Sequence, residues 1–238
     1  MKLTTIQLGA TLTSLLLLVI SSVYAQDTLR AHVELTRTGH RLKDSSNAVV
    51  WLNPVGVTAQ PPQQTRVPQL VQKNKSFQPS LIVIPAGGKV EFPNHDPFFH
   101  NVFSLFEGKR FDLGLYESGT TRFVQFDKPG ISFIFCNIHA EMSAVVIALA
   151  TPYYAISNAR GDVTIADVPP GRYQLQIFHA GVAPDALHAM TREITIAPGQ
   201  ANLGTFTLAE SDVTVEHKNK YGRDYDRPQP DSPAYARP

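Results

Sequence analysis

Cysteine is almost absent from this chain, because Cys136 is the only one among 238 residues. No disulfide can therefore form within the chain, and the odd thiol has three possible fates: an intermolecular bridge, a reactive thiol or metal ligation. An excess of charge of one sign is also lacking, since 21 Lys and Arg stand against 20 Asp and Glu. This even balance argues against nucleic-acid binding, which favours a clustered basic surface.

Long apolar runs are confined to the N-terminus. Lys2 supplies a positive charge, an apolar stretch runs through Leu15–Ile20, and Val23-Tyr24-Ala25 places small residues at the cleavage positions. This predicts residues 1–25 as a Sec-type signal peptide cut after Ala25, and a periplasmic mature protein; an uncleaved anchor is the alternative. No second apolar stretch exists, so we expect no stable membrane span after cleavage. Loss of Lys2 lowers the formal net charge from +1 to about zero.

Long stretches of helical periodicity are missing too, and strand signals dominate. Runs rich in Val, Ile, Phe and Thr are separated by turns such as Pro85-Ala86-Gly87-Gly88 and Lys128-Pro129-Gly130. Many short strands with such spacing predict an all-β sandwich protein. The expected strands are 31–35, 48–52, 81–84, 89–92, 101–106, 121–126, 132–135, 144–148, 154–157, 162–165, 172–178, 193–196 and 201–208.

Signatures of common enzyme classes do not occur. The sequence has no P-loop, no Gly-rich dinucleotide turn and no H-E-x-x-H motif, and its acidic residues form no paired-carboxylate pattern. We therefore expect a protein that is not an enzyme.

What the chain does have is a cluster of soft metal-ligand types. Cys136, His139 and Met142 fall within seven residues, and His100 lies upstream. Two imidazoles, one thiolate and one thioether form the ligand set of a blue-copper centre, with the thioether as a long axial contact. Three unrelated core residues are the alternative, since free Cys and Met are often buried as hydrophobes. Structural zinc rarely recruits Met, which makes a zinc site the weaker metal reading.

The residues around these four extend the pattern. Phe77-Gln78-Pro79, Gly88–Phe92 and His100-Asn101-Val102, followed by Asp127–Phe133 leading into Cys136, resemble the cupredoxin family. The amicyanin and pseudoazurin members are the most similar, together with plastocyanin-like proteins labelled as methylamine-utilisation proteins. The resemblance covers residues 75–150. It implies one type-1 copper per chain, with His100, Cys136, His139 and Met142 as ligands. It also implies that Asn101 ties the two ligand loops together.

The chain departs from this family at one position. Small blue proteins often have Pro just before the second ligand His, and this chain has Ile138, a departure that bears on the redox potential more than on ligation. Glu141 is a potential hard ligand beside Met142. His95, five residues before His100, is interpreted as an exposed loop residue rather than a ligand. The resemblance further implies an apolar docking patch for redox partners near His139, formed by Pro97, Phe98, Phe99 and Ala140.

A second resemblance covers the region after the copper unit. Residues 157–165, continuing into Val168–Ile177, resemble the carboxypeptidase-regulatory-like (transthyretin-like) sandwich, and 32–35 with 47–52 fit the beginning of that fold. We expect residues 27–60 and 151–210 to form this sandwich, with the cupredoxin unit inserted. The rival is that 27–37 supplies the first cupredoxin strand. The expected fold is thus a cupredoxin Greek-key β-sandwich plus a second, small immunoglobulin/transthyretin-like β-sandwich.

Two segments carry little apolar content. Gly56–Lys75 is rich in Pro and Gln and is interpreted as a surface connection. Residues 211–238 are polar, charged and Pro-rich, which predicts a disordered tail.

Two functions fit these observations. The first is a periplasmic type-1 copper protein that carries single electrons between redox partners. The second is a periplasmic copper carrier or resistance protein that uses the same ligands to hold and release the metal, with His217 assisting capture. Oxidase chemistry is rejected, because multicopper oxidases need several His-x-His pairs and this chain has none.

Overall fold

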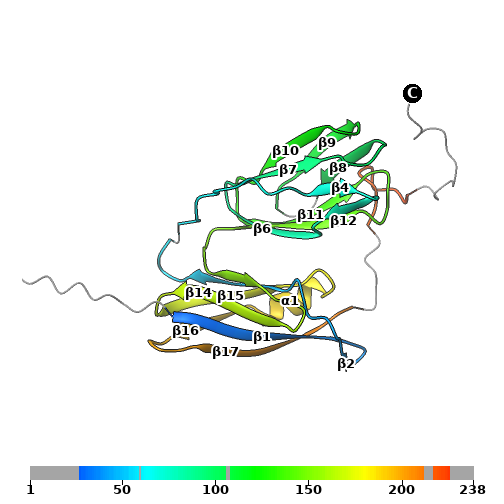
Figure 1. Ribbon diagram of the computed structural model, residues 1–238. Coiled ribbons are helices and arrows are strands. Elements are labelled where there is room, and N and C mark those ends of the chain that lie inside the picture. The colour runs from blue at the N-terminus through cyan, green and yellow to red at the C-terminus, as the bar shows by residue number, and fades with distance from the viewer. Residues whose placement is uncertain (1–26, 59, 106–107, 212–216, 226–238) are drawn as a thin grey trace, which may run out of the picture.

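The computed structural model describes residues 27–58, 60–105, 108–211 and 217–225. Within these residues the chain is almost entirely β, with a single short helix, and Figure 1 shows two β-sandwiches stacked on each other. They are called here the upper and the lower sandwich, after their places in Figure 1. In the described part of the chain, no helix is both long and apolar enough to cross a membrane. The expected signal peptide, residues 1–25, lies outside the described residues.

The lower sandwich combines strands from both ends of the chain. One sheet has the order β14-β1-β17, with β2 paired to β1, and the other has the order β13-β3-β15-β16. β1 and β3 thus pair with strands that follow the upper sandwich in sequence. The elements of the lower sandwich are β1 (Asp27–Arg37), β2 (His40–Arg41), β3 (Val49–Pro54), β13 (Tyr154–Ile156), β14 (Asp162–Val168), β15 (Gly171–Phe178), α1 (Pro184–Met190), β16 (Arg192–Ile196) and β17 (Asn202–Ala209).

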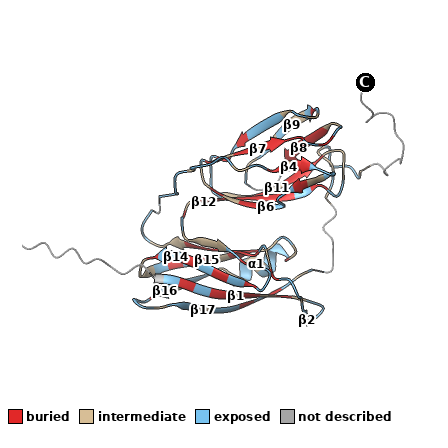
Figure 2. Cartoon of the chain, in the orientation of Figure 1, coloured by how far each residue is buried: buried red, intermediate tan, exposed pale blue. Residues whose placement is uncertain are grey.

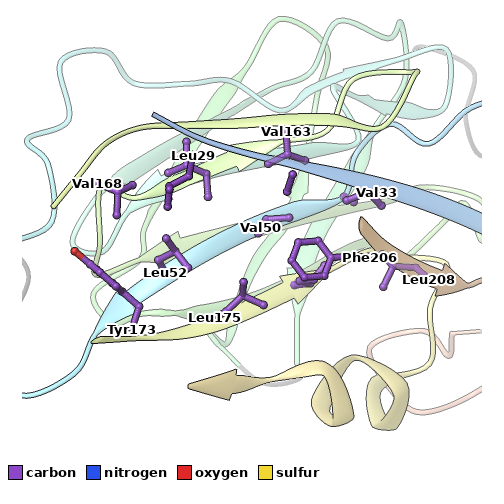
Figure 3. Close-up of a cluster of buried hydrophobic side chains, with 14 of the residues drawn as sticks. Leu29, Val33, Val50, Leu52, Val163, Val168, Tyr173, Leu175, Phe206 and Leu208 are labelled. Atoms are coloured by element: carbon purple, nitrogen blue, oxygen red, sulfur yellow. The ribbon is translucent and has the colours of Figure 1, made fainter. Parts of the chain in front are cut away.

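Its core is built by simple alternation. Leu29, Ala31, Val33 and Leu35 are buried on one face of β1, and the residues that alternate with them are more exposed. Because successive side chains of a strand point to opposite faces, this pattern directs one face of β1 inward. Figure 3 shows the side chains of Leu29 and Val33 meeting those of the opposite sheet, such as Val50 and Leu52.

The upper sandwich is formed by the middle of the chain. Its main sheet has the order β6-β12-β11-β8-β9. The pairs β10-β7 and β4-β5 lie opposite, and isolated bridges from Gln69 and Gln72 join the second pair to the first. The strands are β4 (Val71–Lys73), β5 (Ser76–Gln78), β6 (Leu81–Pro85), β7 (Lys89–Pro93), β8 (His100–Ser104), β9 (Phe111–Tyr116), β10 (Thr121–Gln125), β11 (Gly130–Cys136) and β12 (Ser143–Leu149).

A third apolar cluster joins the two sandwiches. Val49 and Trp51 alternate with the core residues of β3, and Val145 and Ile147 alternate with the core residues of β12. Both strands are therefore buried on both faces, as the red ribbon of β12 in Figure 2 illustrates. The members of this interface cluster are Val49, Trp51, Leu81, Val145, Ile147, Leu149 and Phe178. Burial of this kind favours one fixed arrangement of the two units.

Each expected strand coincides with an observed one, but five elements were not expected: β2, β4, β5, β9 and α1. β9 contains Asp112 and Gly114, which are poor strand formers. The reading of Gly56–Lys75 as a surface connection was wrong for its last part, because Leu70 and Gln72 are fully buried. β4 and β5 form a hairpin whose turn residues, Asn74 and Lys75, both have φ of 55°.

Candidate metal centre

Strand ends place the predicted ligands at one end of the upper sandwich. His100 opens β8, and Cys136 closes the neighbouring strand β11. The two strands are antiparallel, with Cys136 opposite Val102, so both residues lie at the same edge. His139 and Met142 lie in the short loop between β11 and β12. We call residues 136–142 the ligand loop.

Two imidazole nitrogens converge on one sulfur. The Sγ atom of Cys136 lies 3.6 Å from Nδ1 of His100 and 3.6 Å from Nδ1 of His139. The three donor atoms all lie within 4.8 Å of one another. Donors on one ion, with bonds of about 2.0 Å to nitrogen and about 2.3 Å to sulfur at a near-trigonal angle, are about 3.6 Å apart. The observed spacing therefore fits a shared metal ion.

Met142 is the fourth ligand that the sequence predicted. It is fully buried and belongs to the same core cluster as Cys136. Two backbone hydrogen bonds hold it there: its N–H donates to the carbonyl of His139 (3.1 Å), and its carbonyl accepts from the N–H of Cys136 (3.2 Å). The loop thus closes on itself, and its one thioether is directed into the sandwich.

A buried carboxylate fixes the orientation of His100, whose Nε2 donates to Oδ2 of Asp96 at 2.8 Å. Backbone N–H groups of Asn74 and Lys75 donate to the same carboxylate, at 2.6 and 2.9 Å. Burial raises the pKa of Asp96, but the hydrogen bonds from Lys75, His100 and Asn74 outweigh it, and the net pKa is lowered. Asp96 therefore stays ionised and keeps the proton of His100 on Nε2, which leaves Nδ1 free to bind a metal.

Burial also keeps His139 neutral. Desolvation, with smaller contributions from the charges of His100 and Lys75, lowers the pKa of His139 to about 4. Its ring packs against those of Phe98 (5.6 Å between centroids) and His100 (4.9 Å), and the residue remains partly exposed. A neutral imidazole with Nδ1 directed at the sulfur is ready to act as a metal ligand.

The surroundings of the Cys136 sulfur shift its pKa in two opposite directions. Burial raises the pKa of Cys136, while backbone N–H groups of Asn101, Ile138 and His139 lower it by donating to the sulfur. Burial prevails, so the metal-free protein holds a neutral thiol. A bound metal ion would displace that proton.

Asn101 ties the two loops together through its backbone rather than its side chain. Its N–H donates to the sulfur, and its carbonyl accepts from the N–H of Asn137 at 3.2 Å. The side-chain amide instead donates to Asp112 at 2.6 Å. The resemblance implied that Asn101 links the two ligand loops, and its backbone makes that link.

The remaining residues that the sequence singled out lie on the surface of this end. His95 is exposed and outside the donor cluster, and Glu141 is exposed. Pro97 and Ala140 are exposed, Phe98 and Phe99 are half-buried, and the ring of Phe98 packs against that of His139.

Residues 217–225 also reach this end, which differs from the expectation of a disordered tail over 211–238. Figure 1 shows this orange-red segment beside the ends of β8 and β11. It contacts the ligand loop through His217, Lys220 and Tyr225. The sequence analysis predicted neither this segment nor the hydrogen bond between Asp96 and His100. The spacing of these two residues, four apart, was the one available signal for that bond.

No protein-family model matches the chain, and the comparison with curated proteins found no match. Among solved structures, similar ones include a copper-containing nitrite reductase from Thermus scotoductus SA-01, at 26% identity and a TM-score of 0.34 over 41% of this chain. The chain covers 25% of that enzyme. A purple cupredoxin from Nitrosopumilus maritimus has 22% identity and a TM-score of 0.31, over 34% of this chain and 98% of its own.

Amicyanin from Paracoccus versutus has 18% identity and a TM-score of 0.33, over 42% of this chain and 97% of its own. All three matches are partial. The protein itself is an all-β chain whose upper sandwich brings two imidazole nitrogens and a thiol sulfur to one buried point, a donor set that suits copper.

Proposed function

We propose that this protein is a type-1 copper protein that carries single electrons between redox partners. The observation that carries the proposal is the convergence of both Nδ1 atoms on Cys136 Sγ at 3.6 Å, in the same core cluster as the fully buried Met142. Bound there, copper would supply one-electron chemistry between Cu(I) and Cu(II). Thiolate and thioether suit the reduced ion and imidazole suits both, so one rigid donor set can serve both states.

Each residue has a distinct part in this proposal. Cys136 is the thiolate ligand, and His100 and His139 complete a trigonal set. Met142 is the weak axial ligand. Asp96 holds His100 in the required tautomer, and the backbone N–H groups around the sulfur keep the thiolate in place. Little has to move when the electron arrives or leaves, because the hydrogen bonds of the surrounding chain fix these groups.

The electron route follows from exposure. His100 and Cys136 are fully buried, while His139 is partly exposed beside Phe98, in the predicted patch of Pro97, Phe98, Phe99 and Ala140. We infer that redox partners dock on this apolar patch and exchange electrons through the edge of His139. The signal features of the N-terminal sequence support a periplasmic location for this exchange, and the proposed role needs no enzymatic step.

The test is a visible and EPR spectrum of the mature protein loaded with Cu(II). An intense blue thiolate-to-copper band with narrow hyperfine splitting is expected, and it should vanish in Cys136→Ser and persist in the control His95→Ala. A pale spectrum with wide splitting, or binding of Cu(I) alone, would contradict electron transfer and favour the copper carrier.

A further inference from the structure

Residues 217–225 form a compact turn against the ligand loop, and we call them the C-terminal clasp. The side chain of Asn219 organises the turn, since its Oδ1 accepts from the N–H groups of Tyr221 and Arg223. The N–H of Asn219 donates to the carbonyl of Arg223, and Lys218 pairs with Asp224. These bonds pre-shape the segment, so its contacts with the upper sandwich come from a defined structure.

Three contacts of the clasp reach the ligand loop. The hydroxyl of Tyr225 donates to the carbonyl of Cys136 at 2.7 Å, and Nε2 of His217 donates to the carbonyl of Ala140 at 2.6 Å. Between them, the N–H of Lys220 donates to Oδ1 of Asn137 at 2.9 Å. The clasp therefore contacts the loop at the backbone of Cys136 and at Ala140, the residue that follows His139.

Two further contacts anchor the clasp to the strands. The ring of His217 stacks on that of Phe135, with 4.0 Å between centroids, and the hydroxyl of Tyr225 lies 3.1 Å from Nδ1 of His217. Lys220 Nζ pairs with Asp112 of β9 at 2.8 Å. Asp112 also accepts from Asn101, so the anchor continues into the residue that binds the Cys136 sulfur.

We propose that the C-terminal clasp is a positioning element for the metal centre, which holds the ligand loop closed and restricts exchange of the metal. Within the upper sandwich, backbone hydrogen bonds hold the ligand loop. They include two bonds between residues of the loop, one between Asn137 and Asn101, and those to the Cys136 sulfur. Ile138 leaves this loop without the rigid φ that a proline would supply. Contacts from outside the upper sandwich supply that rigidity instead. The metal part of this proposal rests on the proposed function.

The first test uses the metal-free, full-length protein and needs no copper. Cys136 is the only thiol and is fully buried, so a thiol reagent can modify it only when the loop opens. Tyr225→Phe removes one hydrogen bond to the loop and should speed modification about fivefold, as expected for one net hydrogen bond. Tyr221→Phe, the same change at an exposed tyrosine of the same segment, should match wild type. Equal rates in all three proteins would overturn the proposal.

The second test uses the Cu(II)-loaded protein. Tyr225→Phe should shift the energy of the thiolate-to-copper band and speed copper loss to a chelator about tenfold, as for other residues that orient a ligand. The melting temperature should stay at that of Tyr221→Phe. An unchanged band with an unchanged rate of copper loss would overturn the positioning role. A wild-type protein without any such band would refute the proposed function alone, since the thiol test judges the clasp separately.

Discussion

The two sandwiches bury different kinds of polar groups. In the lower sandwich, the buried polar side chains are the hydroxyls of Ser45, Thr151 and Ser157, each of which binds a backbone group. In the upper sandwich, carboxylate, amide and imidazole groups are buried together near the ligand loop. They include Gln72, Asn94, Asp96, His100 and Asn101.

Hydrogen-bond satisfaction differs in the same direction. Among the described residues, the buried side-chain atoms without a partner are Gln72 Oε1, Asn101 Oδ1 and Ser104 Oγ, all in the upper sandwich. Buried polar groups cost stability unless they are fully paired. The lower sandwich is thus built for stability, while the upper one gives up some stability to hold a reactive site, and the interface cluster joins them.

The largest effect that would sharpen this comparison is expected from Phe206→Ala in the lower core. Phe206 is almost fully buried, and its removal should cost about 3–5 kcal/mol of unfolding free energy. Urea unfolding measures this loss, and the exposed Val57→Ala is the control. The copper spectrum of the folded variant should not change. A changed spectrum would break the separation between the two sandwiches.

Asp96→Asn should instead weaken copper binding in the upper sandwich. An amide at this place turns an N–H₂ group toward the donors of Asn74 and Lys75 or toward His100, so His100 loses its orientation. We expect a loss of about 10–100-fold in copper affinity, measured by competition with a chelator. Asp127→Asn changes an exposed carboxylate paired with Lys109 and should leave the affinity unchanged. Equal losses in both variants would refute the orienting role.

A smaller effect is expected from Ser157→Ala. The hydroxyl of Ser157 donates to the carbonyl of Ser45 at 2.6 Å and accepts from the N–H of Ala48 at 2.9 Å. Its loss leaves two backbone groups unpaired and should cost about 1–2 kcal/mol. Denaturant unfolding measures the change, with the exposed Ser80→Ala as control. If Ser157→Ala is neutral, the lower core tolerates unpaired groups and the contrast with the upper one weakens.

The smallest expected effect is a pH dependence of the lower sandwich. Burial lowers the pKa of His179, although Glu210, the backbone of Ser46 and Asp44 oppose this. The folded pKa then lies below the unfolded value of about 6.5, so the unfolded state binds the proton more tightly. Stability should fall as the pH drops below that value. His179→Gln should flatten this part of the stability curve, and an unchanged slope would contradict it.

The sequence predicted those parts of the structure that a pattern of side chains marks, and it did not predict the others. Alternating apolar residues predicted the main strands, and the positions of His100 and Cys136 at strand ends explain why they meet. The hairpin of β4 and β5 was not predicted. Its turn depends on positive φ at Asn74 and Lys75, which no alternation of apolar residues indicates. Backbone N–H groups bind the carboxylate of Asp96, and backbone carbonyls accept hydrogen bonds from the clasp. Every residue has such backbone groups, so these contacts correspond to no sequence motif.

The order of strands along the chain also sets an order of assembly. β1 pairs with β17 across more than 160 residues, so the lower sandwich cannot close until the whole upper sandwich has been synthesised. Contacts between such distant segments form late, because the chain between them must first be ordered. The C-terminal clasp follows β17 along the chain and is synthesised after it. The ligand loop therefore precedes its cover along the chain, and it can form before the clasp closes over it.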